Sequence, residues 1–361
     1  MQGGDCWASS YTILKLCEIV GIKAHLRFGA NQPGATGHRN VAALIDGKIY
    51  VGEAGFGYYQ INRPYLVSEE NVGFYLKNKN STTKTAMLFQ YDGFEENIIV
   101  PEKIDNYTIN EIGDYAFYYG KTYSGMKVKS IELPDTIEKI GNSSFYTLDL
   151  IETIKIPKKV NTIGKRTFSN CSKIKEIKVD SSNKFFDTDE GVLYDYNKTK
   201  LLAFPTAKEE EYTGLTSLTE VDDYAFYYTT KINKLILPGG IKKVGEYAFS
   251  HSPLKEIYFA GPQPEFGSNV FEHVNATIYY PKNENWDTKS INTNNAIKIS
   301  FAQWEPPKNL SFGYKSYTWI WVVVIIVFVL VLGLVGYIVY RKKRLGNNES
   351  IEGVNAFGKL L

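Results

Sequence analysis

The chain has few of the residues that build disulfide frameworks or metal sites. Among its 361 residues there are only three cysteines and four histidines. Three cysteines make no paired framework, and Cys6 and Cys17 would lie roughly 16 Å apart along one helix, too far to bridge. The histidines show no metal-ligand spacing with cysteines or carboxylates. We therefore expect no disulfide, no metal and no other cofactor.

Excess charge of either sign is also missing. The chain has 41 basic and 39 acidic residues, a net charge of +2. This balance gives no electrostatic reason to expect a nucleic-acid partner. Aromatic residues, in contrast, make up 14% of the chain and include 27 tyrosines. Such a content is typical of an adhesive or repeat surface.

A signal peptide is missing as well. Met1 is not followed by a basic segment and an apolar segment of the required length. We expect a chain that is truncated at its N-terminus. A protein whose own membrane span directs insertion is the alternative.

One long hydrophobic run lies near the other end, where residues 317–340 carry no charge. About 20 apolar residues cross a hydrocarbon core of roughly 30 Å, so the run predicts a transmembrane helix. The basic segment 341–344, "RKKR", places the end of the chain in the cytoplasm. We predict a single-pass protein of the plasma membrane whose N-terminal part is extracellular. Residues 301–318 are the stalk, residues 319–340 the transmembrane helix and residues 341–361 the cytoplasmic tail.

Between about residues 98 and 291 the chain repeats itself. Residues 131–153 align with residues 154–176 at a 23-residue period, and residues 235–256 match one residue shorter. An Ile/Val-Gly-x-x-Ala/Ser/Thr-Phe element recurs in these units, starting at Ile112, Ile140, Ile163, Val221, Val244 and, in degraded form, Phe266. In the Val221 copy Asp222 replaces the glycine.

A period in the twenties with one short alternating strand per unit predicts a leucine-rich-repeat solenoid. The phenylalanine of each element is expected to fill the stacked core, as is Cys171. Residues 185–205 interrupt the period and predict a hairpin of their own. The units resemble the BspA-like leucine-rich repeats of bacterial and protist surface proteins, and residues 91–300 are assigned to this solenoid.

The N-terminal stretch "GGDCWASSYTILKLCEIVGI" predicts a helix from Cys6 to Val20, with Asp5 as N-cap and Gly21 as C′. One face of this helix carries Cys6, Ser10, Ile13, Cys17 and Val20. A cysteine at a helix N-terminus favours its thiolate, which suits a nucleophile. It is equally compatible with a core cysteine.

Asp46-Gly47 predicts a two-residue hairpin turn. The numbers of two paired residues then sum to 93, so Asn40 lies opposite Glu53. Residues two apart along a strand share a face of the sheet, so His38 is a diagonal neighbour of Glu53 on that face. Cys6, His38 and Glu53 together form a Cys–His–acid constellation, in which the imidazole takes the thiol proton and the carboxylate orients the imidazole.

The elements "GDCW" and "GHR" over residues 3–60 resemble the core of the transglutaminase-like superfamily. The resemblance implies a papain-like α+β partial domain, residues 1–90, with Cys6 as nucleophile, His38 as base and Glu53 in the acid position. Glutamate replaces the usual aspartate, and the segment that would precede the cysteine is missing. The stretch "DGKIYVGEAGFG" is also similar to an arylamine N-acetyltransferase motif, although nothing else points to acetyl-CoA.

Two classes of function follow. The first is a membrane-anchored surface protein whose solenoid binds extracellular protein or glycan ligands. The second adds a thiol-dependent amidase, peptidase or acyl-transfer activity in the head domain. A purely binding or structural surface antigen with an inactive head remains the alternative.

Overall fold

The computed structural model describes residues 6–28, 39–46, 48–52, 74–91, 93–118, 127–208 and 211–307. The chain divides into two compact units, residues 1–312 and 313–361. The predicted transmembrane segment lies outside the described residues. Within the described ranges, no helix is both long and apolar enough to cross a membrane.

The N-terminal part of the described chain is one helix beside a three-stranded sheet. Its elements are α1 (Cys6–Ile19), β1 (Lys23–Phe28), β2 (Arg39–Ile45) and β3 (Lys48–Gly52). The strands are antiparallel in the order β1-β2-β3. Leu14 of α1 and Val41 of β2 are both buried and form a small apolar cluster. The helix therefore packs against the hairpin at these residues.

The end of α1 follows the predicted cap. Gly21 adopts φ of +75°, and the N–H of Ile22 donates to the carbonyl of Cys17 at 2.8 Å. This is a Schellman cap, in which glycine reaches the left-handed conformation without steric cost. The predicted inward face needs correction, because Val20 lies beyond the helix and is 67% exposed, whereas Leu14 is buried.

The register of the predicted hairpin is confirmed. Ile45 pairs with Lys48 and Val41 with Gly52, so the paired numbers sum to 93 over the whole of the β2–β3 ladder. Asp46 adopts φ of +50°, the left-handed conformation that a tight two-residue turn requires.

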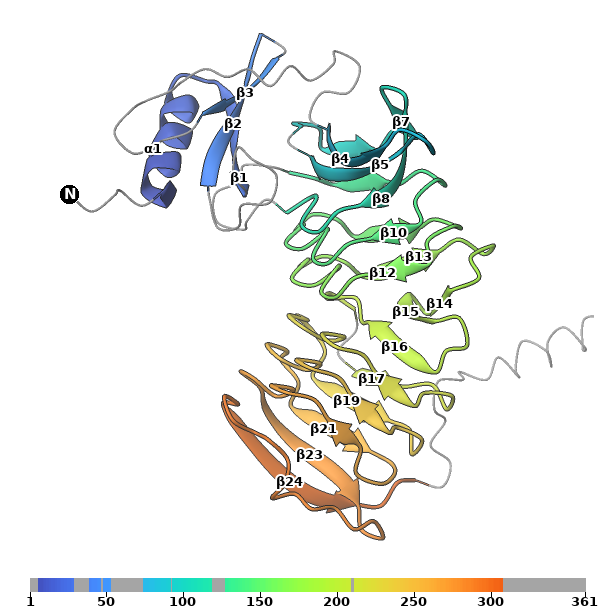
Figure 1. Ribbon diagram of the computed structural model, residues 1–361. Helices are drawn as coiled ribbons and strands as arrows, with labels where there is room; N and C mark the ends of the chain where they lie inside the picture. Colours follow the sequence, from blue (N-terminus) through green and yellow to red (C-terminus); the bar gives the residue numbers. More distant parts are fainter. Residues whose placement is uncertain are drawn as a thin grey trace, which may run out of the picture. The chain divides into compact units, whose positions relative to one another are not determined.

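The remaining strands build a β-solenoid whose turns stack in sequence order from cyan to orange in Figure 1. A parallel column is formed by the first strand of each turn: β6 (Asn97–Ile99), β9 (Ser130–Glu132), β11 (Thr153–Ile156), β13 (Glu176–Val179), β17 (Glu211–Thr213), β19 (Lys234–Leu237), β21 (Glu256–Phe259), β23 (Asn275–Pro281) and β24 (Lys298–Trp304).

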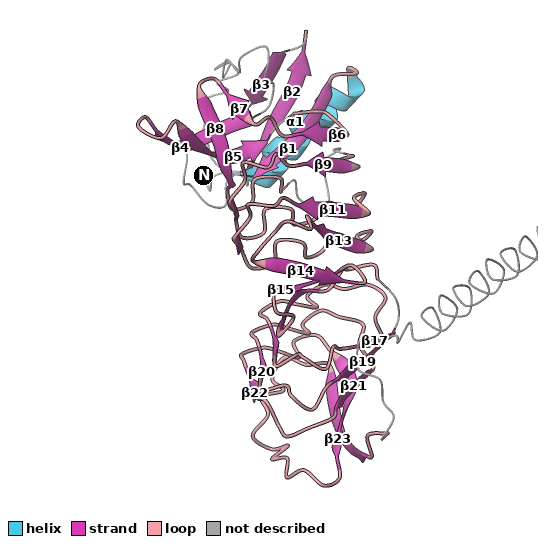
Figure 2. Ribbon diagram, turned by 90° about the vertical axis from the view of Figure 1, so that its right-hand side faces the viewer, coloured by secondary structure: helices cyan, strands magenta, loops and turns pink. Residues whose placement is uncertain are grey.

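A second column consists of shorter strands from the repeated Ile/Val-Gly element. These are β8 (Tyr107–Ile112), β10 (Lys139–Ile140), β12 (Thr162–Ile163), β16 (Lys200–Ala203), β18 (Glu220–Val221), β20 (Lys243–Val244) and β22 (Glu265–Phe266). Figure 2 shows β20 and β22 on one side of the solenoid and β19, β21 and β23 on the other. The first turn also receives β4 (Phe74–Asn80), β5 (Thr85–Tyr91) and β7 (Lys103–Ile104).

The phenylalanines of the repeated element fill the space between the two columns, as predicted. Phe117, Phe145, Phe226 and Phe249 are fully buried and Phe168 is 4% exposed. Neighbouring rings stack, with centroids 5.5 Å apart between Phe117 and Phe145 and 5.9 Å apart between Phe145 and Phe168. Cys171 is buried, and its Sγ lies 2.9 Å from the carbonyl oxygen of Phe145, which confirms it as a core residue.

The glycine of each element is required by the close approach of successive turns. A Cβ atom on Gly164 would lie 2.4 Å from the backbone nitrogen of Asn142, and one on Gly245 would lie 2.4 Å from that of Asp223. Side chains also join the turns, because the Oδ1 of Asn142 accepts a hydrogen bond from the N–H of Lys165 at 2.8 Å. Hydrophobic packing and hydrogen bonds therefore set the same register.

The predicted hairpin in the insertion is confirmed and is larger than expected. β14 (Phe186–Asp189), β15 (Val192–Asp195) and β16 form an antiparallel meander. β16 then pairs in parallel with β18 and so enters the second strand column. The core divides here into two clusters, one ending at Leu193 and the other running from Val192 to Ile291.

Candidate functional site

Two of the three predicted catalytic residues, His38 and Glu53, lie outside the described residues. Cys6 is the first residue of α1, as predicted from the sequence. The Cys6–His38–Glu53 site therefore stays a prediction. Cys17, which lies on the partly buried face of the same helix, is a free cysteine, and burial raises the pKa of its thiol.

A different site, a notch in the solenoid, arises where the insertion supplies an abbreviated turn. The N–H of Asp222 donates to the carbonyl of Leu201, and the N–H of Phe204 donates to the carbonyl of Ala225. Leu201 and Phe204 thus take the places of the isoleucine and phenylalanine in the repeated element. They are three positions apart, whereas Ile140 and Phe145 are five apart. The abbreviated turn is two residues short.

The residue after Val221 reflects this shortening. Elsewhere the corresponding glycine meets the backbone of the preceding turn, and a Cβ atom would collide with it. The missing residues are those that would stand against this position, so Asp222 has room for its side chain. Asp222, which replaces the glycine of the repeated element, therefore lies at the edge of a hollow.

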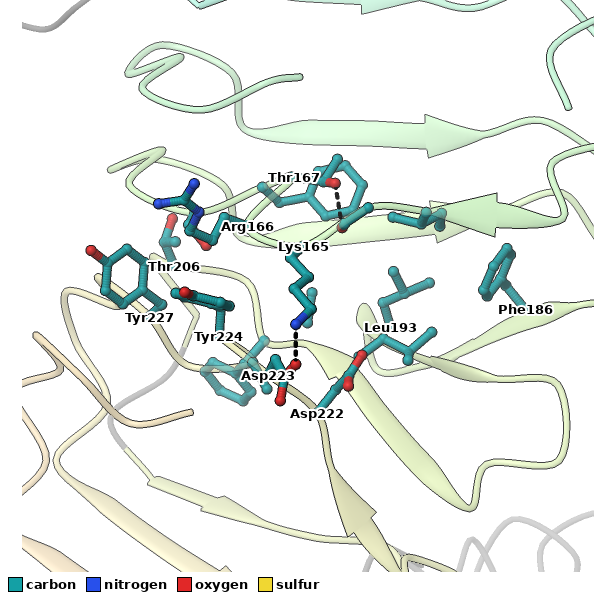
Figure 3. A pocket seen from close by; sticks show the side chains of 18 residues that line it. Lys165, Arg166, Thr167, Phe186, Leu193, Thr206, Asp222, Asp223, Tyr224 and Tyr227 are labelled. Carbon is teal, nitrogen blue, oxygen red and sulfur yellow. Dashed lines mark hydrogen bonds and ion pairs between the residues drawn. The ribbon is translucent and has the colours of Figure 1, made fainter. Parts of the chain in front are cut away.

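The hollow is a pocket of about 90 Å³ between the turns that carry Phe168 and Phe226. Figure 3 shows Arg166, Thr206, Tyr224 and Tyr227 gathered at one end and apolar side chains at the other. Lys165 reaches across the middle toward Asp223. We call this pocket the Arg166 notch.

Most of the charges around the notch are balanced. The Nζ of Lys165 lies 2.6 Å from the Oδ2 of Asp223, and the Nζ of Lys200 lies 2.8 Å from the Oδ1 of Asp222. Burial raises the pKa of Asp222, although the hydrogen bond from Lys200 opposes this. For Asp223 burial acts in the same sense, but hydrogen bonds from Lys165 and from the N–H of Glu246 outweigh it and lower the pKa.

Arg166 differs from these groups, because no carboxylate among the described residues pairs with it. Its Nη2 donates to the hydroxyl of Tyr115 at 3.1 Å, and its guanidinium lies over the ring of Tyr224, 5.3 Å from the centroid. Its positive charge also favours the ionised forms of Tyr146 and Tyr227, so the guanidinium lies among tyrosines. A guanidinium held in this way has further N–H groups, fixed in one plane, that can donate hydrogen bonds to a ligand.

The notch interrupts a row of aromatic side chains on the turn edge of the solenoid. This row, the tyrosine edge, comprises Tyr115, Tyr118, Tyr146, Arg166, Tyr224, Tyr227, Tyr228, Tyr247, His251 and His273. Tyr224 and Tyr247 stack with centroids 5.1 Å apart, and Tyr228 stacks on His251 at 4.4 Å. Tyr115, Arg166, Tyr224 and Tyr247 all have φ between 53° and 61°.

Arg166 is the only permanently charged member of the tyrosine edge, and the neighbouring carboxylates of Glu246 and Glu272 act electrostatically on Tyr224 and Tyr227. Burial raises the pKa of Tyr146 to about 12, with a further contribution from Tyr228, so its hydroxyl stays protonated at neutral pH. Burial also raises the pKa of Tyr227. Burial, together with the neighbouring His273, lowers the pKa of His251 and favours its neutral ring. The edge therefore presents aromatic surface and hydroxyl donors around one fixed cation.

Two features of the sequence correspond to this site. The tyrosines recur at fixed offsets from the repeated element, and Asp222 breaks its glycine pattern. Neither signal shows a pocket by itself, because the pocket depends on how the insertion joins the strand column.

The repeat region matches a family model described as "BspA type Leucine rich repeat region", in six copies over residues 87–208 and 202–298. These ranges include more than half of the chain. The chain belongs to the BspA-type leucine-rich repeat family. No curated protein matches it.

Three solved structures are also similar to parts of this chain. The pneumococcal vaccine antigen PcpA is 20% identical over 58% of this chain, with a TM-score of 0.39, and the match spans 60% of the antigen's chain. A leucine-rich repeat protein from Eubacterium ventriosum is 20% identical over 73% of both chains, with a TM-score of 0.42. A leucine-rich cell surface protein from Faecalibacterium prausnitzii is 15% identical over 63% of this chain and 94% of its own, with a TM-score of 0.40.

Proposed function

We propose that the chain is a membrane-anchored cell-surface protein whose BspA-type solenoid binds extracellular ligands. The tyrosine edge is the observation that carries this proposal. Tyrosine gives a large contact area at a small cost in conformational entropy, and its hydroxyl donates hydrogen bonds, so tyrosines are enriched in binding surfaces. Residues 91–300 form the binding part, 301–318 the stalk, 319–340 the span and 341–361 the cytoplasmic tail.

Adhesion to a glycan-rich surface tests this proposal. Beads that carry the full chain in lipid nanodiscs are added to immobilised mucin, and attachment under flow is counted. The double variant Tyr227→Ser/Tyr228→Ser should attach several-fold less than the unchanged protein, because it removes the centre of the tyrosine edge. Tyr196→Ser is the matched control, since Tyr196 is an exposed tyrosine of the insertion. Equal attachment of the three proteins would contradict a binding role for the edge.

Glycosylation tests the proposed topology. Asn197 and Asn275 belong to N-x-Ser/Thr sites and are exposed, whereas Asn348 follows the span. If the chain is expressed behind a secretory signal in eukaryotic cells, we expect glycan on Asn197 and none on Asn348. The measurement is the mass shift on treatment with an N-glycosidase, compared with Asn197→Gln. Glycan on Asn348 alone would reverse the orientation.

A second candidate function is thiol-dependent acyl-transfer, amidase or peptidase chemistry in a transglutaminase-like head, residues 1–90. The register of β2 and β3 favours it, because the same register, continued by one pair beyond Val41 and Gly52, would set Asn40 opposite Glu53. In this candidate Cys6 is the nucleophile, His38 the base and Glu53 the group that orients the imidazole. A surface antigen with an inactive head is the competing interpretation.

Selective alkylation distinguishes these two interpretations. A thiol at a helix N-terminus beside an imidazolium has a pKa below the usual value of about 8.5. At pH 6–7, limiting iodoacetamide should therefore label Cys6 before Cys17 and Cys171, as measured by peptide mass spectrometry. His38→Ala should remove the preference. If all three cysteines react only after unfolding, the enzyme candidate fails.

A further inference from the structure

The Arg166 notch has a specific chemical composition that nothing in the proposed function uses. Lys165 and Lys200 are paired with carboxylates, whereas Arg166 is held by a tyrosine hydroxyl and a tyrosine ring. The notch therefore presents one positive charge that no described carboxylate neutralises. An anionic group fits that position, and a carboxylate fits the planar fork of a guanidinium in two parallel hydrogen bonds.

The rest of the notch suits a polyhydroxylated molecule. Asp222 and Asp223 line one wall, and the carboxylate oxygens of such residues accept hydrogen bonds from hydroxyl groups. Tyr227 stands at the mouth beside Arg166 (Figure 3). The C–H groups on one face of a pyranose ring pack well against an aromatic ring of this kind. The pocket, about 90 Å³, encloses part of a sugar unit and leaves the rest of it on the surface.

We propose that the Arg166 notch binds the terminal acidic sugar of an extracellular glycan, a sialic or uronic acid. The sugar carboxylate pairs with the Arg166 guanidinium, its ring lies against Tyr227, and its hydroxyls donate to Asp222. The sugars that follow in the glycan lie along the tyrosine edge. This inference rests on the proposed function, because it names the class of ligand that the solenoid binds.

An acidic peptide shares the carboxylate but lacks the other groups. A side chain of Asp or Glu has no hydroxyl groups to donate to Asp222 and no pyranose face for Tyr227. Since the notch offers an aromatic ring close to Arg166 and the carboxylates of Asp222 and Asp223 along its wall, the observations favour the sugar.

Binding of matched sugars to the full chain in nanodiscs tests the inference. The probes are methyl glucuronide and its neutral counterpart methyl glucoside, and sialyllactose and its neutral counterpart lactose. Saturation-transfer NMR and calorimetry should show that at least one acidic sugar binds at least tenfold more tightly than its neutral counterpart. Arg166→Gln should reduce the affinity for that acidic sugar at least tenfold and leave the weak neutral binding unchanged.

Two further variants separate the pocket from a general charge effect. Ala203→Phe places a ring in the pocket, which Ala203 lines, and should abolish binding of the acidic sugar. Lys159→Gln removes an exposed positive charge from the turn that also carries Arg166 and should leave the affinity unchanged. An unaltered urea midpoint for each variant excludes a folding defect as the cause of lost binding.

Three results would overturn the inference: equal affinity for acidic and neutral sugars, an Arg166→Gln variant with undiminished affinity, or an acetylated acidic dipeptide that binds more tightly than either acidic sugar. Absence of binding to all four sugars would also overturn it. These outcomes remain distinct from failure of the proposed function, because the adhesion of beads to mucin depends on Tyr227 and Tyr228 whether or not the ligand is acidic. Attachment that survives sialidase and Arg166→Gln would leave the binding role in place and remove the acidic sugar.

Discussion

Replacing Phe145 by alanine will lower the free energy of unfolding by about 3–5 kcal/mol, the usual cost of truncating a fully buried aromatic side chain. Phe145 is completely buried, and its ring lies between the rings of Phe117 and Phe168, so no neighbour can close the cavity without breaking a stack. Urea denaturation of the full chain, followed by circular dichroism, measures the change.

Two other phenylalanines serve as comparisons for Phe145. Phe185 is 51% exposed, and Phe185→Ala should change the stability by less than about 0.5 kcal/mol. Phe168 lines the Arg166 notch, so Phe168→Ala extends an existing space and should cost less than Phe145→Ala. Equal losses for Phe145 and Phe185 would mean that the phenylalanine row does not stabilise the solenoid.

Replacing Gly245 by alanine will destabilise the chain by about 1–3 kcal/mol or more, since the added methyl group overpacks a close contact between turns. The new Cβ atom would lie 2.4 Å from the backbone nitrogen of Asp223, and backbone atoms cannot rotate away as the end of a side chain can. The urea midpoint of the full chain should fall accordingly.

The matched substitution lies one turn earlier in the solenoid. Asp222 occupies the position equivalent to Gly245 but faces the shortened turn, so Asp222→Ala meets no preceding backbone. It loses the contact with Lys200, which keeps its second partner Glu220 at 3.1 Å. We expect a change of within about 1 kcal/mol. A larger loss at Asp222 than at Gly245 would contradict the origin of the notch in the missing residues.

The repeats could be predicted from the sequence because one physical requirement acts again and again. Each turn needs a phenylalanine to fill the core and a glycine to let the next backbone approach. The pattern Ile/Val-Gly-x-x-x-Phe therefore indicates both the core packing and the close contact between turns. The hairpin at Asp46 was predictable for a similar reason, because a two-residue turn fixes the pairing of both strands. Local chemistry determines both features.

The Arg166 notch could not be predicted in the same way. Its residues come from four segments, around Lys165, Leu193, Thr206 and Asp222. These segments approach one another only because β16 joins the second strand column. The sequence pattern indicated a hairpin in the insertion but not that its last strand continues the solenoid. For the same reason the sequence pattern did not predict that Phe204 of the insertion stacks on Phe226, with centroids 4.8 Å apart.

The shortened turn also has a mechanical consequence. Other neighbouring turns are joined by hydrogen bonds along at least one strand column. At the notch both columns are interrupted, because among the described strands β12 does not pair with β16 and β13 does not pair with β17. Stability in stacked repeats is a sum of nearest-neighbour interfaces, so the weakest interface separates cooperative blocks. A pulling force applied between a bound ligand and a cell would therefore open the solenoid first beside the Arg166 notch, with the two core clusters yielding as separate units.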